Sequence, residues 1–372
     1  MKIVLCGGGT AGHINPAIAI AEEIKRQDQT SEIMFIGRDM GKENRLVEKT
    51  NIKIKTIKVS GLKRSLSPQN IKIVHDAIKA KQTAKKILSE FSPDIVLGTG
   101  GYVCWPVLKA AKELGIKTAI HESNVSPGLV TRLLSPSCDL VLLNHIESSA
   151  KLFTKGRMVV VGNPLRSDFS RITRTEARHS LGLQSHEILI VSFGGSGGSE
   201  KMNDVILELI EKYSSKENDI KHIHATGEKY FNKQESLKYS TKENGCKIVP
   251  YIDDMPRLLK ASDIVICRCG SVTLSEISAA GVAAILIPSP NVSNNHQCKN
   301  AKKFEDKNAA VVLDEKTLDF ESLKNCVFHL KSDKIERKNR AKTILHLSTP
   351  DAAKRVTNEL FLLTNPAKKA AL

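Results

Sequence analysis

The chain has 372 residues, which is more than one compact domain usually holds and enough for two domains that each bury a core. Aromatic residues make up only 4% of it, so we expect no aromatic platform for stacking bases and no nucleic-acid partner. The formal net charge of +16 instead favours contact with phosphate groups or with an anionic membrane surface.

Short apolar runs alternate with helix-like segments along the whole chain. In the first half, strands are expected at residues 2–6, 33–36, 54–59, 94–97, 118–120, 140–143 and 158–161. In the second half, strands are expected at residues 188–193, 247–249, 264–267, 284–287 and 310–313. Because such runs are typical of parallel sheets covered on both faces, the pattern predicts an α/β chain of two doubly wound, Rossmann-like domains.

The change from a strand to a polar segment near Gly162-Asn163-Pro164 predicts the boundary between the two domains. We therefore expect a first domain over residues 1–162 and a second over residues 163–345. The last helix, expected at about residues 351–363, would pack back on the first domain. No apolar stretch approaches the roughly 20 residues that span a bilayer, so any membrane contact is expected to be peripheral.

Two glycine-rich turns each follow a strand and precede a helix. They read Gly7-Gly8-Gly9-Thr10-Ala11-Gly12-His13 and Gly194-Gly195-Ser196-Gly197-Gly198-Ser199. Glycine tolerates positive φ and has no side chain, so backbone N–H groups can approach an anion, which the N-terminus of the following helix also attracts. Two such turns predict two similar domains with a phosphate-bearing ligand between them.

Further polar groups are expected at the carboxyl ends of the strands, where ligands of parallel sheets collect. In the first half these are Gly98-Thr99-Gly100-Gly101-Tyr102 and His121-Glu122-Ser123-Asn124. In the second half, the segment from Arg268 to Glu276 enters a helix whose first turn carries Ser271 and Thr273. Those hydroxyls suit a pyrophosphate, and the Glu276 carboxylate suits ribose hydroxyls. For each group, helix capping or a structural hydrogen bond is the alternative.

A dehydrogenase is an alternative function, because Gly7, Gly9 and Gly12 match the dinucleotide-binding fingerprint. The second strand, however, ends at Arg38 and offers no acidic residue for a ribose, although Arg38 could accept a 2′-phosphate. The segment from Arg268 to Glu276 also disfavours a dehydrogenase. A third possibility is a binding module that keeps the fold and lacks activity.

Lysines concentrate between residues 61 and 86, where they alternate with apolar residues such as Ile71, Ile73 and Ile78. A solvated face of a helix is one interpretation of this segment. A patch that rests on an anionic membrane surface is the other.

The motifs, in their order, resemble those of the MurG family, the peptidoglycan glycosyltransferases that convert lipid I to lipid II. They are residues 7–13, 98–102, 121–124, 162–164, 251–255 and 268–276. The resemblance implies the GT-B fold, in which the second domain holds the donor UDP-N-acetylglucosamine and the first holds the lipid acceptor. It also implies transfer to the C4 hydroxyl of the N-acetylmuramoyl sugar of undecaprenyl-pyrophosphoryl-muramoyl-pentapeptide.

The same resemblance implies a set of donor-binding residues. These are Thr10, Ala11, Gly12 and Asn124 from the first domain, Arg166 and Ser196 near the phosphates, Ile252 at the uracil, Ser271, Val272, Thr273, Leu274, Ser275 and Glu276 at the pyrophosphate and ribose, and Gln297 at the N-acetylglucosamine. Some family members have paired glutamines where this chain has His296-Gln297, so the role of His296 stays open.

His13 is the preferred general base, because an imidazole accepts a proton near neutral pH. Glu122 is the rival base, or the partner that orients His13. The chain has no Asp-x-Asp triplet, so we expect no metal and no cofactor. Backbone N–H groups, helix dipoles and Arg166 would neutralise the departing UDP. The resemblance also implies a peripheral protein on the cytoplasmic side of the cell membrane, with an anionic leaflet and a wall-synthesis complex as partners.

Overall fold

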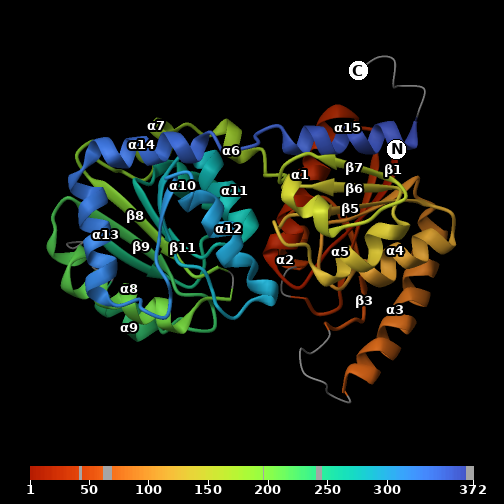
Figure 1. Ribbon diagram of the computed structural model, residues 1–372, viewed down its shortest axis with the longest axis horizontal. Helices are drawn as coiled ribbons and strands as arrows, with labels where there is room; N and C mark the ends of the chain where they lie inside the picture. The colour runs from red at the N-terminus through yellow and green to blue at the C-terminus, as the bar shows by residue number, and fades with distance from the viewer. Residues whose placement is uncertain (42–43, 62–68, 196, 240–244, 366–372) are drawn as a thin grey trace. The chain divides into compact units, whose positions relative to one another are not determined.

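The structure is a computed structural model that describes residues 1–41, 44–61, 69–195, 197–239 and 245–365 (Figure 1). It divides the chain into two compact units. The first unit holds Met1–Ser167 together with the C-terminal segment from Thr349, and the second holds Asp168–Ser348. Residues 163–167 thus belong to the first unit and not to the second domain, where they were expected. Ser123 Oγ donates to Asn163 Oδ1 at 3.3 Å, which ties this segment to the first sheet.

The first unit contains a parallel sheet in the order β3-β2-β1-β4-β5-β6-β7. The strands are β1 (Lys2–Cys6), β2 (Glu32–Arg38), β3 (Lys53–Ile57), β4 (Ile95–Gly98), β5 (Lys117–Glu122), β6 (Leu140–Leu143) and β7 (Arg157–Val160). The central pairing sets Ile3 beside Ile95 and Leu5 beside Leu97. Both faces of these strands are buried, which is why they appear in the sequence as continuous apolar runs.

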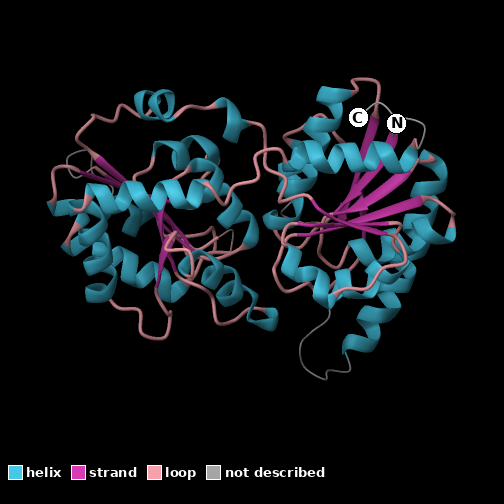
Figure 2. Cartoon of the chain, turned by 45° about the horizontal axis from the view of Figure 1, so that its top comes forward, coloured by secondary structure: helices cyan, strands magenta, loops and turns pink. Residues whose placement is uncertain are grey.

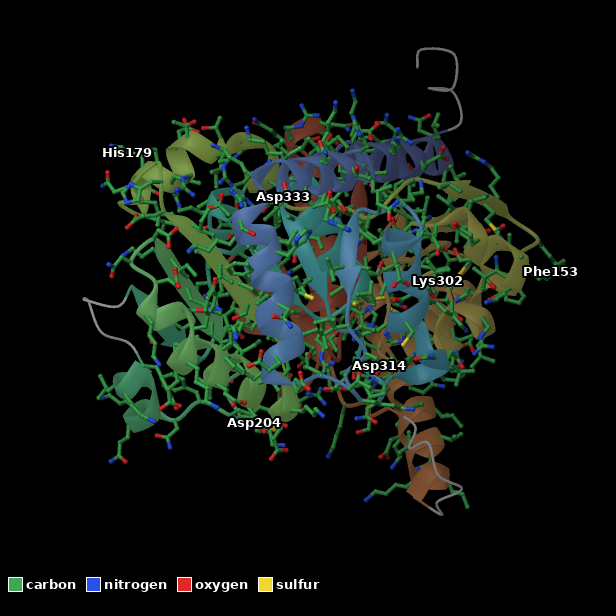
Figure 3. The ribbon with its side chains drawn as sticks, turned by 60° about the vertical axis from the view of Figure 1, so that its left-hand side comes forward. Phe153, His179, Asp204, Lys302, Asp314 and Asp333 are labelled. Atoms are coloured by element: carbon green, nitrogen blue, oxygen red, sulfur yellow. The ribbon has the colours of Figure 1, made fainter. Side chains whose placement is uncertain are left out.

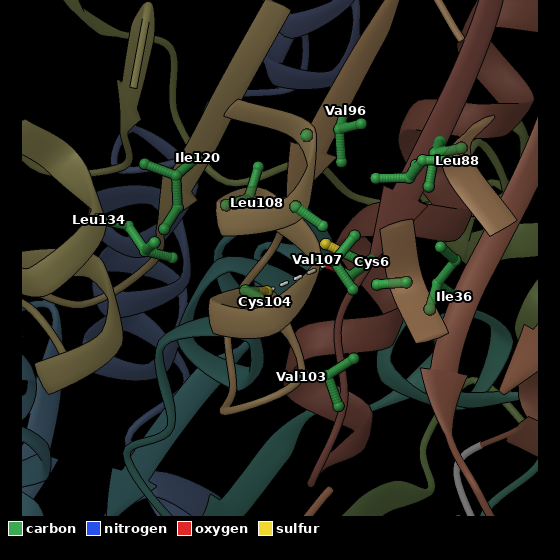
Figure 4. Packing of buried hydrophobic residues seen from close by; sticks show 14 of the residues in the cluster. Cys6, Ile36, Leu88, Val96, Val103, Cys104, Val107, Leu108, Ile120 and Leu134 are labelled. Atoms are coloured by element: carbon green, nitrogen blue, oxygen red, sulfur yellow. Dashed lines mark hydrogen bonds between the residues drawn. The ribbon is translucent and has the colours of Figure 1, made fainter. Parts of the chain in front are cut away.

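Helices cover both faces of this sheet (Figure 2). They are α1 (Ala11–Gln27), α2 (Asn44–Glu48), α3 (Gln69–Phe91), α4 (Cys104–Glu113), α5 (Leu129–Leu134) and α15 (Ala352–Thr364). One core lies where α3 and α4 pack over Cys6 and Val96 (Figure 4). The other lies where α1 and α15 pack over Leu5. The C-terminal helix therefore contributes Val356 and Leu360 to the core of the first unit.

The second unit repeats the architecture with a parallel sheet in the order β10-β9-β8-β11-β12-β13. Its strands are β8 (Ile188–Phe193), β9 (Ile220–Ala225), β10 (Cys246–Val249), β11 (Ile264–Cys267), β12 (Ala283–Leu286) and β13 (Ala310–Val312). Its helices are α6 (Asp168–Arg171), α7 (Arg174–Ser180), α8 (Glu200–Lys212), α9 (Lys233–Tyr239), α10 (Met255–Ala261), α11 (Ser271–Ala280), α12 (His296–Glu305), α13 (Phe320–Ser332) and α14 (Lys334–Leu345). The prediction of two doubly wound, parallel-sheet domains is confirmed.

A buried polar network joins β8 and β9 inside the second unit. Ser192 Oγ lies 2.8 Å from His222 Nε2 and 2.9 Å from His224 Nδ1, and Ser214 Oγ lies 3.0 Å from His222 Nδ1. Burial disfavours the charged imidazolium, and it lowers the pKa of His222 to about 3 and that of His224 to about 4. Both imidazoles are therefore neutral at pH 7.

The network predicts a pH-dependent stability of the second unit. Below the ordinary histidine pKa of about 6.5, the unfolded chain binds protons that the folded imidazoles cannot, so the free energy of unfolding falls as the pH decreases toward about 4. The expected slope is up to about 1.4 kcal/mol per pH unit for each histidine. Amide hydrogen exchange of β8 and β9, followed between about pH 6.5 and pH 4, measures this change in the free energy of unfolding.

The variant His222→Asn is expected to be less stable but to show a shallower slope, because one of the two titrating groups is gone. The exposed His179 of α7 provides the control, and His179→Asn should leave the slope unchanged. Equal slopes in wild type and His222→Asn would contradict the assignment.

Candidate functional site

Two glycine turns of the first unit interlock at the carboxyl ends of β1 and β4. Gly8 N donates to Gly100 O at 3.3 Å, and Thr99 Oγ1 donates to the carbonyl oxygen of His13 at 2.6 Å. A Cβ added to Gly101 would overlap the carbonyl group of Gly8, and Gly101 has a φ of +82°. Both turns therefore need glycine for the close approach of their backbones.

His13 lies in the first turn of α1, directly against this interlock. Thr10 is the extended N-cap of the helix and makes no side-chain capping hydrogen bond. A Cβ added to Gly100 would overlap the imidazole of His13, so this glycine leaves the room that the ring occupies. The half-buried His13 is thus fixed at the carboxyl edge of the sheet, beside the backbone of Thr10, Ala11 and Gly12.

His121 and Glu122 end β5 at the same edge but have different environments. His121 is buried, and its Nε2 donates to Gly162 O at 2.9 Å. Burial lowers the pKa of His121, and the nearby His13 lowers it further, whereas the Gly162 carbonyl and Glu122 oppose this shift. His121 is therefore a neutral structural residue that lies close to His13.

The carboxylate of Glu122 accepts hydrogen bonds from the loop that follows β5. Its Oε1 accepts from Asn124 N at 2.9 Å and from Asn124 Nδ2 at 3.1 Å, and its Oε2 accepts from Gly128 N at 2.9 Å. Glu122 is only 4% exposed. This geometry gives Glu122 the role of holding Asn124 and the start of α5 in place.

The second unit presents the first turn of α11 at the carboxyl end of β11. Gly270 is the N-cap and has no side chain to satisfy the N–H groups of this turn. Leu274 is unsuited to direct contact with a ligand, because its N–H already donates to Gly270 O at 2.9 Å and its side chain is 3% exposed. The side chain of Val272 is apolar, so only its backbone could bind a phosphate group.

Arg268 links several elements at this edge. Its Nη1 donates to Ile287 O at 3.2 Å, and its Nη2 contacts Ser199 Oγ and the carboxylate of Glu315. The side chains of Arg268 and Glu315 are both largely buried. Arg268 therefore fixes the carboxyl ends of β11 and β12 against the start of α8, and its charge is balanced within the protein.

Helix α12 holds the peptide groups around Cys269. Gln297 Oε1 accepts from Cys269 N at 3.2 Å and from Ser289 N at 2.8 Å, and Asn300 Nδ2 donates to Cys269 O at 3.1 Å. Because two N–H donors fix the oxygen of Gln297, its Nε2 points away from them and can donate to a ligand. His296 begins the same helix and is half-buried.

The structure brings the expected residues to the carboxyl edges of their sheets, unit by unit. In the first unit these are Thr10, Ala11, Gly12, His13, Glu122 and Asn124, whereas Arg166 lies in the segment after β7 that precedes the unit boundary. In the second unit these are Ile252 after β10, residues 271–276 of α11 and Gln297 of α12. Ser275 Oγ donates back to Ser271 O at 3.1 Å. Ser196 lies outside the described residues.

Two residues of these edges were missed by the sequence analysis as contributors to the site. Glu315 and Asn300 fix the loop between β11 and α11, whereas Thr99, which fixes His13, belongs to the expected motif at residues 98–102. The position of Glu315 just after β13 was the available signal, because it predicts the same sheet edge. Asn300 gave no signal, since a single amide within a helix has no characteristic spacing.

The described residues contain no cluster of three or more His, Cys, Asp or Glu side chains arranged to hold a metal ion. In the same part of the chain, no helix combines the length and the apolar character that crossing a membrane requires.

Comparisons with known proteins agree with this arrangement. The glycosyltransferase family 28 N-terminal domain matches residues 3–143, and its C-terminal domain matches residues 189–356. The chain is 40% identical over 356 residues to a protein of Acetivibrio thermocellus named UDP-N-acetylglucosamine--N-acetylmuramyl-(pentapeptide) pyrophosphoryl-undecaprenol N-acetylglucosamine transferase, with 96% of each chain covered. It is 44% identical to the protein of the same name from Caldanaerobacter subterraneus subsp. tengcongensis, with 90% and 92% covered.

Solved structures show the same fold. The crystal structure of Acinetobacter baumannii MurG matches with a TM-score of 0.70 and 25% identity, over 96% of this chain and 98% of that one. A UDP-GlcNAc 2-epimerase from Neisseria meningitidis, bound to UDP-GlcNAc, matches with a TM-score of 0.66 and 14% identity, over 97% and 100% of the two chains, which shows a shared fold alone. The chain belongs to glycosyltransferase family 28 and, within it, to the family of N-acetylglucosamine transferases named above.

Proposed function

We propose that the chain transfers N-acetylglucosamine from UDP-N-acetylglucosamine to lipid I, undecaprenyl-pyrophosphoryl-N-acetylmuramoyl-pentapeptide, and so forms lipid II in peptidoglycan synthesis. The observation that carries the proposal is the 40% identity to a transferase of this name over 96% of both chains. The interlocked glycine turns and the start of α11, at the carboxyl edges of the two sheets, support the proposal. Family membership leaves no support for the dehydrogenase alternative.

We assign the donor to the second unit. The first turn of α11, with the hydroxyls of Ser271 and Thr273, faces the diphosphate of UDP, where N–H groups and the helix dipole favour negative charge. Glu276 binds the ribose hydroxyls, and the backbone at Ile252 binds the uracil. Gln297 donates through Nε2 to the N-acetylglucosamine, since its Oε1 is already occupied.

We assign the lipid acceptor to the first unit and the role of general base to His13. The C4 hydroxyl of the muramoyl sugar attacks C1 of N-acetylglucosamine and loses its proton to the imidazole. The bond between C1 and the diphosphate oxygen breaks, and its electron pair leaves with UDP. Because the hydroxyl attacks the face of C1 opposite UDP, the configuration is inverted and the new bond is β. The interlock at Gly100 and Thr99 fixes the base, which keeps the imidazole in position before substrate binds.

The variant His13→Ala tests the base. Loss of a positioned base typically costs about 10²-fold or more in kcat/KM, and the acidic limb of the pH–rate profile should disappear with it. Binding of UDP-N-acetylglucosamine should be retained, because the donor residues of the second unit are untouched. A transfer assay with a lipid I analogue gives the rate, and donor titration gives the affinity.

Two further variants make this test specific. His179→Ala, an exposed histidine of α7, should keep the wild-type rate and profile. Glu122→Gln should lower the rate through the loop at Asn124 while preserving the acidic limb, because His13 remains. A His13→Ala enzyme with the wild-type profile, or a Glu122→Gln enzyme without the acidic limb, would contradict the assignment.

We also propose that no metal or cofactor takes part. The charge that develops on UDP is met by backbone N–H groups and hydroxyls of α11, with Arg166 as the expected cation. Enzyme prepared without metal and assayed in excess chelator should therefore transfer at the full rate. Loss of activity that added Mg²⁺ restores would show that a metal replaces these groups.

We propose that α3 carries the contact with the anionic inner leaflet of the cell membrane. Its C-terminal half packs into the core through Ala84 and Leu88. Its N-terminal half exposes Ile71, Val74 and Ile78, which are 77%, 51% and 48% exposed and share one helical face. Lys72 and Lys79 lie exposed beside them. The protein would thus act as a peripheral protein on the cytoplasmic side, where a wall-synthesis complex could recruit it.

Not every lysine of this segment is available to a membrane. Lys81 and Lys85 lie 2.6 and 3.4 Å from the carboxylate of Glu113 and hold α3 on α4. Lys63 and Arg64 lie outside the described residues. The membrane contact therefore rests on the apolar face around Val74 with its flanking lysines.

A triple variant, Ile71→Ser with Val74→Ser and Ile78→Ser, tests this contact. Because each exposed apolar side chain adds area buried in the lipid interface, binding to anionic vesicles should fall by about tenfold or more. Vesicle flotation measures it. The matched control replaces Leu237, Ile335 and Leu345 of the second unit, which are also exposed, by serine. Equal binding of the test variant and wild type would remove α3 from the membrane contact.

A further inference from the structure

A cavity of about 870 Å³ opens in the second unit, away from the groups described above. It lies at the amino ends of β8, β11 and β12, whereas the glycine turn and α11 follow the carboxyl ends of these strands. Helices α7, α13 and α14 form its walls, and α14 begins at its N-cap Asp333 (Figure 3). Its volume falls within the range of about 300–1,000 Å³ that small-molecule sites occupy.

The acidic groups that line this cavity are paired with cations of the protein. Asp263 lies 2.7 Å from Arg174 and 2.9 Å from Arg178. Asp219 lies 2.9 Å from Lys331, and Glu187 lies 3.2 Å from Lys221. Each carboxylate of the lining thus has a cation of the protein beside it, and Lys331 also pairs with Glu217 at 2.7 Å.

Three further cations of the lining have no carboxylate partner among the described residues. They are Lys334, Arg337 and Lys338, which share one face of α14. Arg337 is only 9% exposed, and its Nη1 donates to the carbonyl oxygens of Leu330 at 2.6 Å and Lys331 at 2.8 Å. These carbonyl groups end α13, so the guanidinium caps this helix and interacts with its dipole. No described carboxylate lies beside it, and an anion in the cavity would complete the balance of its charge.

An aromatic ring adds a second kind of contact. Phe328 of α13 lines the same cavity and is 56% exposed, and the wall continues with the apolar Ile188 and Val282. A planar organic ring can pack on such a surface while an attached phosphate reaches the cations of α14.

We propose that this cavity binds a phosphate-bearing small molecule of nucleotide size. Its phosphate contacts Arg337, Lys334 and Lys338, and its planar ring packs on Phe328. The site is separate from the donor-binding groups and does not depend on the proposed function, because no residue of its lining takes part in the transfer reaction.

The test uses the full chain with AMP and inorganic phosphate as probes. AMP carries both the phosphate and a planar ring, and inorganic phosphate carries only the charge. Site-resolved hydrogen exchange should show protection of α13 and α14 on addition of AMP at millimolar concentrations. Inorganic phosphate should protect α14 at higher concentrations than AMP.

Variants separate the two contacts. Lys334→Gln with Lys338→Gln should weaken both probes by about fivefold or more, since each charge contributes a modest share at an exposed site. Phe328→Ala should weaken AMP and leave inorganic phosphate unchanged. The matched control is Lys247→Gln with Lys342→Gln, which removes the same charge from exposed positions outside the lining.

Two results would overturn the proposal. One is the absence of protection in α13 and α14 with both probes. The other is an equal loss of affinity in the control pair, because that result would reflect the overall charge of the protein and not this cavity.

Discussion

The close approach of two backbone turns is the constraint on which the first unit depends. The turn after β1 and the turn after β4 meet so closely that a Cβ on Gly101 would overlap the backbone of Gly8. The same contact leaves the space in which the His13 ring lies, because Gly100 presents no side chain to it. A parallel pairing of β1 with β4 is what brings the two turns together. The sheet order thus determines where the imidazole lies.

In the second unit, side-chain hydrogen bonds hold the corresponding loop in place. Its loop between β11 and α11 is held at Cys269 by Gln297 and Asn300, and at Arg268 by Ser199 and Glu315. These partners come from α8, α12 and the segment after β13, which are far apart in the sequence. The N–H groups of α11 are therefore preorganised by the whole sheet edge, which is the condition under which such groups stabilise developing charge most effectively.

The sequence alone predicted most of the fold, because strands buried on both faces are continuous apolar runs. It missed β9, since His222 and His224 interrupt the apolar pattern of that strand. Their burial becomes understandable only when Ser192 and Ser214 are seen beside them. The sequence also did not show that residues 163–167 belong to the first unit. Their place there depends on the contact of Ser123 with Asn163.

The candidate site shows the same limit of sequence reasoning. A motif indicates which residues gather at a sheet edge, but it does not show which hydrogen-bond partner each polar atom has. Glu122 stands next to His121 in the chain, yet its oxygens serve Asn124 and Gly128. Leu274 lies inside the α11 motif, yet its N–H is already bonded within the helix. Only three-dimensional hydrogen bonding separates a ligand-binding group from one that supports it.

Two buried arginines of the second unit illustrate how charge balance separates such roles. Arg268 lies at the carboxyl edge of the sheet and has the Glu315 carboxylate as its partner, so it is electrically satisfied without a ligand. Arg337 lies at the opposite edge and meets only the carbonyl oxygens of Leu330 and Lys331. In the proposed function, the diphosphate of UDP is therefore met by the N–H groups of α11 and not by Arg268. Arg337 caps the carbonyl end of α13 and has no carboxylate partner among the described residues, so its charge at the cavity favours an anion from outside the chain.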